Sequence, residues 1–168
     1  MTLYGIQSAP PLSLLSYALR REAGLTALPE LAQSERGKPY FPHRPDLQFS
    51  WSHSGPYLLL ALSRFPVGVD IEVIRPRREN LPGYALTAEE KTEYHALGSD
   101  WPAFFTLWTR KEAWCKYTGE GLALALRQTP PKDGPHYGFY TGEDWRACVC
   151  GEEPPPSHII WLDREALT

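Results

Sequence analysis

The chain has 168 residues and six tryptophans, 42% of its residues are hydrophobic, and its formal net charge at pH 7 is −3. This composition predicts one globular domain, or two small halves that share a core, that folds without disulfides. Because acidic and basic residues are interspersed, we expect no non-specific binding to nucleic acid or to an anionic membrane. The three cysteines form no zinc motif, and we find neither a signal peptide nor an apolar run of about 20 residues, so we expect a reduced, cytoplasmic protein.

The first part of the chain predicts short strands and helices in alternation. We expect a strand over residues 3–6, a helix over residues 12–23, and one or two further helical turns over residues 28–36. Gly24 and Gly37 follow the two helical stretches as stop signals.

Residues 37–42 predict a rigid loop, because one glycine and two prolines restrict its backbone. Lys38 in such a loop is either merely exposed or functional, and the loop alone does not decide between them. Residues 49–64 predict two strands joined by Gly55 and Pro56. The second strand is apolar throughout, which is typical of a strand buried on both faces.

Residues 67–72 alternate apolar residues with Gly68, Asp70 and Glu72, and this period of two predicts a strand. Asp70 and Glu72 then point to the same face, where like charges destabilise the strand unless something offsets them. Solvent is the ordinary explanation for such a pair. The alternative is a hard cation, because Mg²⁺ is often held by one or two carboxylates together with phosphate oxygens.

Two helix start signals follow this strand. Thr87, with Glu90 three positions later, forms a capping box, and we expect its helix to end at Gly98. Asp100 can cap a second helix over residues 101–117. After that helix we expect strands over residues 122–127, 137–140, 145–150 and 159–162.

The helix over residues 101–117 carries an apolar stripe, formed by Trp101, Phe104, Phe105 and Trp108. At about 100° per residue, Glu112 lies near the centre of the continued stripe, and Lys111 and Lys116 lie at its edges. A charge on a buried face is costly unless it is paired or bound to a metal, which favours a functional Glu112. The alternative is a solvated i, i+4 pair of Glu112 with Lys116, which stabilises a helix by only about 0.2–0.5 kcal/mol.

The chain therefore offers acids and bases that suit a metal-bridged phosphate anhydride. The acids would hold Mg²⁺, and the bases would neutralise phosphate oxygens. The acids are Asp70, Glu72 and Glu112, and the bases are Lys38, Lys111 and Lys116, with the run Ser52-His53-Ser54 beside them.

Four motifs, in this order, resemble those of the 4′-phosphopantetheinyl transferases of the surfactin-synthetase-activating type. They are Gly37-Lys38-Pro39, Phe49-Ser50-Trp51-Ser52-His53-Ser54, Gly68-Val69-Asp70-Ile71-Glu72, and Trp108-Thr109-Arg110-Lys111-Glu112-Ala113 with Lys116. Gly-x-Asp-x-Glu alone is a weak signal. Followed about forty residues later by Trp-x-x-Lys-Glu-Ala, it is specific to this family.

The resemblance implies an α+β fold, a pseudo-dimer of two similar α/β halves with the active site in the cleft between them. Residues 1–65 would form the N-terminal half, and residues 66–168 the C-terminal half with the metal and catalytic motifs. The implied enzyme is a 4′-phosphopantetheinyl transferase. A serine of an acyl or peptidyl carrier protein would attack the β-phosphate of coenzyme A and expel 3′,5′-ADP.

The resemblance also implies roles for individual residues. Asp70, Glu72 and Glu112 would bind Mg²⁺ with the pyrophosphate of coenzyme A. Glu112 would act as the base, either directly or through a metal-bound water. Lys116 would contact phosphate and stabilise the leaving group. The remaining residues expected at coenzyme A are Lys38 and Pro39 beside the adenosine, Ser52 and His53 at the nucleotide's phosphate, and Lys111.

One departure from the family pattern concerns the N-terminal half, which is shorter than usual, so that no residues align with the basic positions expected at the 3′-phosphate. We therefore expect weaker coenzyme binding, binding by other residues, or dimerisation of a chain otherwise expected to be a monomer. Two alternatives are open: a non-catalytic module that binds coenzyme A or a carrier protein, and a hydrolase built on Ser52 and His53. The hydrolase is disfavoured, because neighbours on a strand point to opposite faces.

Overall fold

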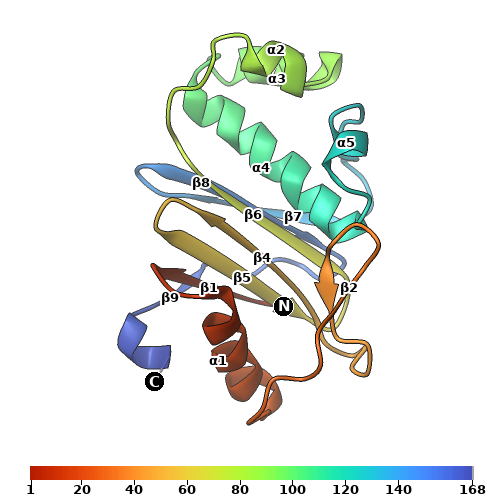
Figure 1. The fold of residues 1–168 in the computed structure, drawn as a ribbon. Coiled ribbons are helices and arrows are strands. Elements are labelled where there is room, and N and C mark those ends of the chain that lie inside the picture. Colours follow the sequence, from red (N-terminus) through yellow and green to blue (C-terminus); the bar gives the residue numbers. More distant parts are fainter. Residues whose placement is uncertain (168) are drawn as a thin grey trace.

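The computed structural model describes residues 1–167, and for residues 124 and 125 only the backbone. Within these residues the fold is α+β, as predicted, with two main sheets (Figure 1). The first sheet has the order β4-β5-β1-β9, formed by Gln48–Ser54, Tyr57–Ser63, Thr2–Gln7 and Ile160–Leu162. The second has the order β6-β8-β7, formed by Val67–Val73, Trp145–Gly151 and His136–Thr141.

The two sheets share one connectivity. In the first, β1 is followed by helix α1 (Pro11–Ala23) and later by the hairpin β4-β5, and β1 pairs antiparallel with β5. In the second, β6 is followed by α4 (Trp101–Thr118) and the hairpin β7-β8, and β6 pairs antiparallel with β8. In both sheets the first strand thus pairs with the last strand of the hairpin. Strand β9 crosses back and pairs parallel with β1.

The elements stack in layers, with α1 on the outer face of the first sheet and α4 on the outer face of the second (Figure 1). The core between the two sheets consists of aliphatic side chains from β1, β5, β6 and β8, among them Leu3, Leu59, Val69 and Val149. Helices α2 (Leu81–Ala85) and α3 (Ala88–Ala96) cover the outer side of α4 around Phe104 and Phe105. Helix α4 is therefore covered on two sides.

The predicted helix starts and several strands are confirmed. Thr87 and Glu90 form the capping box of α3, and the side chain of Asp100 accepts a hydrogen bond from the N–H of Ala103 at the start of α4. Helix α4 ends at Gly119, whose φ of 74° is the left-handed conformation that glycine adopts without strain. The predicted strands at residues 137–140, 145–150 and 159–162 correspond to β7, β8 and β9.

Two predicted elements are wrong. Residues 28–36 are not helical: Ala32–Gln33 forms strand β2, which pairs with β3 (Pro39–Tyr40) across a tight turn at Gly37. Pro29 removes a backbone donor, and the pairing with β3 satisfies backbone groups that a short helix would leave without hydrogen bonds.

Residues 122–127 are not a strand, because Leu122–Ala125 forms the short helix α5. Alternating leucine and alanine fits a period of two, but alanine favours helices over strands. The short 3₁₀ helix Arg164–Leu167 ends the described chain.

Candidate active site

Strand β6 and helix α4 approach each other closely at Gly68. A Cβ atom at this position would lie 2.0 Å from the carbonyl oxygen of Ala113 and 2.3 Å from the backbone nitrogen of Tyr117. Only a residue without a side chain allows the two backbones to pack this closely. The acidic face of β6 is thereby placed directly against the C-terminal half of α4.

The serines of β4 connect the first sheet to β6 by side-chain hydrogen bonds. Ser52 Oγ donates to Asp70 Oδ1 at 2.6 Å, and Ser54 Oγ donates to Glu72 Oε2 at 2.8 Å. Ser50 Oγ accepts from the backbone N–H of Val69 at 3.2 Å. Every second residue of β4 therefore faces β6, and two of these serines orient the predicted metal ligands.

Asp70 is nearly fully buried, with 3% of its surface exposed. Its Oδ1 also accepts from Lys116 Nζ at 2.7 Å, while its Oδ2 is buried and has no hydrogen-bond partner. Burial raises the pKa of the Asp70 carboxyl despite the opposing effect of the Lys116 ammonium. An unpartnered oxygen in a desolvated carboxylate is a free position for a cation.

Glu112 lies one turn before Lys116 on α4, and both side chains line a cavity of about 240 Å³. The pKa of Glu112 is raised to about 7, mainly by burial and also by the charges of Asp70 and Glu72, while Lys116 opposes this shift. Burial likewise raises the pKa of Glu72, and Asp70 adds to this shift. The three carboxyl groups therefore interact electrostatically.

The loop around Lys38 and the strand β4 form the rest of the cavity wall. Lys38, Pro39 and Trp51 line it. Lys38 Nζ donates to the carbonyl of Val67 at 3.2 Å, and burial lowers the pKa of this ammonium. The Arg36 guanidinium donates to the Glu120 carbonyl just after α4, so the loop is attached to the C-terminal end of that helix.

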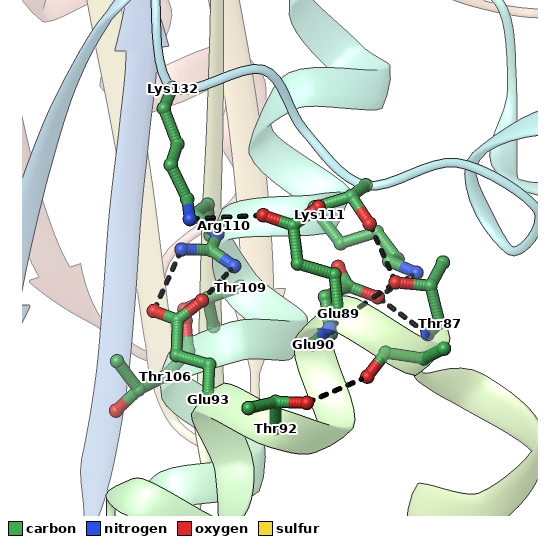
Figure 2. A network of polar contacts seen from close by, with 12 residues as sticks. Thr87, Glu89, Glu90, Thr92, Glu93, Thr106, Thr109, Arg110, Lys111 and Lys132 are labelled. Carbon is green, nitrogen blue, oxygen red and sulfur yellow. Dashed lines mark hydrogen bonds and ion pairs between the residues drawn. The ribbon is translucent and has the colours of Figure 1, made fainter.

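Three residues expected at coenzyme A do not line the cavity: Ser52, which is buried and bonded to Asp70, His53 and Lys111. His53 is exposed and lines a separate hollow with Ser8 and Pro11, because it points to the opposite face of β4 from Ser52. Lys111 requires a correction. The prediction placed it at the edge of a buried stripe, near phosphate, but its ammonium is completely buried on the outer side of α4, where it pairs with Glu90 at 2.6 Å (Figure 2).

The carboxylates beside the cavity are suited to bind a divalent cation, although the side chains of residues 1–167 do not form a complete coordination site. No group of three His, Cys, Asp or Glu residues among the described side chains is arranged to hold a metal by itself. Asp70 nevertheless offers an unpartnered oxygen. Burial raises the pKa values of Asp70, Glu72 and Glu112, and neighbouring carboxylates also raise those of Glu72 and Glu112. A cation that takes its remaining ligands from a phosphate substrate satisfies both features.

Several residues of the site had no role predicted from the sequence. Ser50, Ser54, Arg36 and Trp51 hold or line it. The available signal was the strict alternation of serines with aromatic residues in β4, which gives the strand one polar face and one aromatic face.

The helices of residues 1–167 include none that is long and apolar enough to cross a membrane.

Comparison with known proteins gives a consistent result. Residues 66–157, more than half of the chain, match the family described as the 4′-phosphopantetheinyl transferase superfamily. The transferase Sfp of Bacillus subtilis (strain 168) is 35% identical over 152 residues, which cover 79% of this chain and 68% of Sfp. The transferase AcpT of Salmonella typhi is 42% identical over 101 residues, covering 56% of this chain and 52% of AcpT. Another Bacillus subtilis 4′-phosphopantetheinyl transferase is 36% identical over 94 residues, which span only 42% of its own length.

Proposed function

This chain belongs to the 4′-phosphopantetheinyl transferase superfamily, and we propose that it transfers the 4′-phosphopantetheine group of coenzyme A to a serine of an acyl or peptidyl carrier protein. The relatives are named 4′-phosphopantetheinyl transferases, and the four sequence motifs occur in this chain. The proposal includes dependence on Mg²⁺ and a location in the cytoplasm, with the monomer as the expected form.

The observation that carries the proposal is the contact of Lys116 with Asp70 beside a cavity that Glu112 also lines. A desolvated carboxylate group with one ammonium and one open oxygen can hold a cation and a pyrophosphate together. Asp70, Glu72 and Glu112 would hold Mg²⁺, which would neutralise charge on the pyrophosphate when bound.

The chain's own residues would move the proton and stabilise the charge. Glu112, whose pKa is raised to about 7 in the metal-free protein, would accept the proton of the carrier-protein serine. The serine oxygen bonds to the β-phosphorus, and the bond from that phosphorus to the bridging oxygen of 3′,5′-ADP breaks. Lys116, whose side chain is 29% exposed, neutralises the negative charge that develops on the leaving oxygen.

A chain of adjoining hollows supports coenzyme A as the donor. The cavity at Glu112 shares Gly37, Pro39 and Trp51 with a second hollow, and the second shares Pro11 with a third, which His53 lines. An extended coenzyme with its pyrophosphate at Lys116 could follow these hollows toward His53. In this arrangement Lys38 and Pro39 border the nucleotide, and His53 meets a phosphate.

The shared connectivity of the two sheets supports a pseudo-dimer. Each half consists of a strand, a helix and a hairpin whose last strand pairs with the first strand. We propose that residues 1–65 and 66–168 are the two related halves and that coenzyme A lies between them. The return of β9 to the first sheet adds a contact between the halves.

The hydrolase alternative is not supported by the site. Ser52 is buried and donates its hydroxyl proton to Asp70, while His53 is exposed on the opposite face of β4. The non-catalytic module differs from the enzyme only in turnover.

The test that separates the enzyme from the non-catalytic module is to incubate the protein with coenzyme A, Mg²⁺ and an apo carrier protein and to quantify 3′,5′-ADP by chromatography. Release equal to the carrier protein consumed supports the transferase, whereas calorimetric binding of coenzyme A without release supports the module.

A further inference from the structure

We infer that Lys111 is a positioning residue, whose buried ion pair with Glu90 fixes the rotation of α4 and thereby aims Glu112 into the cavity. The inference rests on the proposed function, because it explains how the base of that reaction is held. It gives the lysine of the Trp-x-x-Lys-Glu-Ala motif a role away from the substrate.

The ion pair is closed to solvent and to any ligand. The side chains of Lys111 and Glu90 are both 0% exposed, and Lys111 Nζ lies 2.6 Å from Glu90 Oε2. Lys111 Nζ also donates to the carbonyl oxygen of Ala85, the last residue of α2, at 3.1 Å. For Lys111 to reach phosphate, its ammonium would have to leave these partners and expose an unpaired carboxylate in the interior, which is highly unfavourable.

Glu90 is itself held by the start of α3. Its Oε2 accepts from the backbone N–H of Thr87 at 2.8 Å, and its own N–H donates to Thr87 Oγ1 at 3.3 Å. Figure 2 shows this capping box beside Lys111. Because one carboxylate oxygen serves both the cap and the ion pair, Lys111 is tied to a fixed point at the N-terminus of α3.

The ion pair acts on α4 from the outer side, which α3 covers. On the inner side, the close approach at Gly68 holds the backbone of α4 against β6. On the outer side, Lys111 pairs with Glu90, and Arg110 forms two hydrogen bonds with Glu93 at 2.9 and 2.8 Å (Figure 2). Consecutive residues on a helix are about 100° apart, so fixing Lys111 outward fixes Glu112 toward the cavity.

A buried ion pair is a poor way to stabilise a fold, since well-packed apolar residues of similar size often stabilise it equally well. Its advantage is a defined geometry, because an ammonium bound to a carboxylate and a carbonyl allows fewer orientations of the lysine side chain than an apolar contact does. This explains why a charged pair occupies a fully buried position beside the proposed base.

The test compares Lys111→Met, Glu90→Gln and the double variant, and the control is the exposed ion pair of Glu89, the neighbour of Glu90 on α3, with Lys132. Glutamine at position 90 still serves a capping box, so the double variant removes both charges and keeps the cap. Glu89, whose partner Lys132 is 71% exposed, gives the control Glu89→Gln. Transfer to a carrier protein is measured as kcat and as KM for coenzyme A, with thermal unfolding alongside.

We expect Lys111→Met and Glu90→Gln to lower kcat by about 10- to 100-fold, the scale of a small misplacement of a reacting group, with KM for coenzyme A within about twofold. The double variant should recover most of kcat and of the melting temperature, and Glu89→Gln should match wild type. If Lys111→Met does not fold, kcat and KM for coenzyme A are compared between Glu90→Gln and the double variant.

A KM for coenzyme A raised about tenfold or more by Lys111→Met, without recovery in the double variant, would overturn the inference and make Lys111 a phosphate ligand. An unchanged kcat in both single variants would overturn it as well. Wild-type protein that transfers nothing to any carrier protein would instead refute the proposed function. The two failures are therefore distinguishable.

Discussion

Lys116 Nζ lies 2.7 Å from Asp70 Oδ1 and thereby joins the end of α4 to the acidic face of β6. The same ammonium donates to the carbonyl oxygen of Val69 at 3.1 Å. In this arrangement the lysine supplies the positive charge that the buried Asp70 requires. A divalent cation at the open Oδ2 of Asp70 would lie close to this ammonium, and the two positive charges would repel each other.

Lys116→Met should therefore strengthen the binding of Mn²⁺ to the protein without coenzyme A. Close charge pairs couple by about 1.5 kcal/mol or more, so the affinity should rise by about tenfold or more. Isothermal titration calorimetry with Mn²⁺ measures this, with the exposed Lys132→Met as the matched control. Weaker or unchanged Mn²⁺ binding in Lys116→Met would show that the lysine and the cation do not share Asp70.

Asp70→Asn should lower transfer by about 10²–10³-fold, the loss expected when one group that stabilises transition-state charge is removed. Its melting temperature should equal or exceed that of wild type, because burial already raises the pKa of Asp70 and thus disfavours its charged form. The exposed Asp133→Asn is the control for a general effect of the substitution. Retained transfer together with a large loss of stability would mean that Asp70 serves the fold and not the reaction.

The stability of the metal-free protein should fall as the pH rises from about 4.5 to about 7. Burial raises the pKa of Glu112 from 4.5 to about 7, so within this range the folded state binds more protons than the unfolded state. Glu112→Gln removes this contribution, and its stability should decrease less with pH than that of wild type. Urea unfolding at pH 5 and pH 8 in EDTA measures the difference, and equal pH slopes for both proteins would refute the burial of this carboxyl.

Gly68→Ala should destabilise the protein by about 1–3 kcal/mol or more, because its Cβ would overlap the backbone of α4. Transfer should fall with it, since Glu112 and Lys116 lie on the displaced helix. Gly83→Ala is the control, because a Cβ there meets nothing within 4 Å and alanine favours the helix α2. Chemical unfolding of both variants gives the comparison, and a Gly68→Ala protein as stable as Gly83→Ala would contradict the close approach.

The local patterns of the sequence predicted the elements around the site well. The period of two at Asp70 and Glu72 and the caps at Thr87 and Asp100 depend on neighbouring residues alone, and the structure confirms them. Local pattern was insufficient in α5, where the same residues fitted both a strand and a helix. It was also insufficient for β2, which is stabilised by pairing with β3 across the turn at Gly37.

The partners of individual side chains depended on tertiary contacts. Lys111 and Glu112 are neighbours in the sequence, but α3 buries the first completely while the second lines the cavity. No periodicity of α4 alone indicates where Glu90 will lie. The serines of β4 were similarly ambiguous, since polar residues at every second position usually face solvent, and here Ser52 and Ser54 face the carboxylates of β6.

The most direct measurement for the proposed transferase is intact-mass spectrometry of an apo acyl carrier protein after incubation with this protein, coenzyme A and Mg²⁺. The reaction predicts a gain of one phosphopantetheine group. The gain should disappear in EDTA, and Glu112→Gln should slow it by about 10²–10⁴-fold, the usual contribution of a general base. An unchanged carrier-protein mass across acyl and peptidyl carrier proteins, with coenzyme A bound to the protein, would contradict the transferase and leave the binding module.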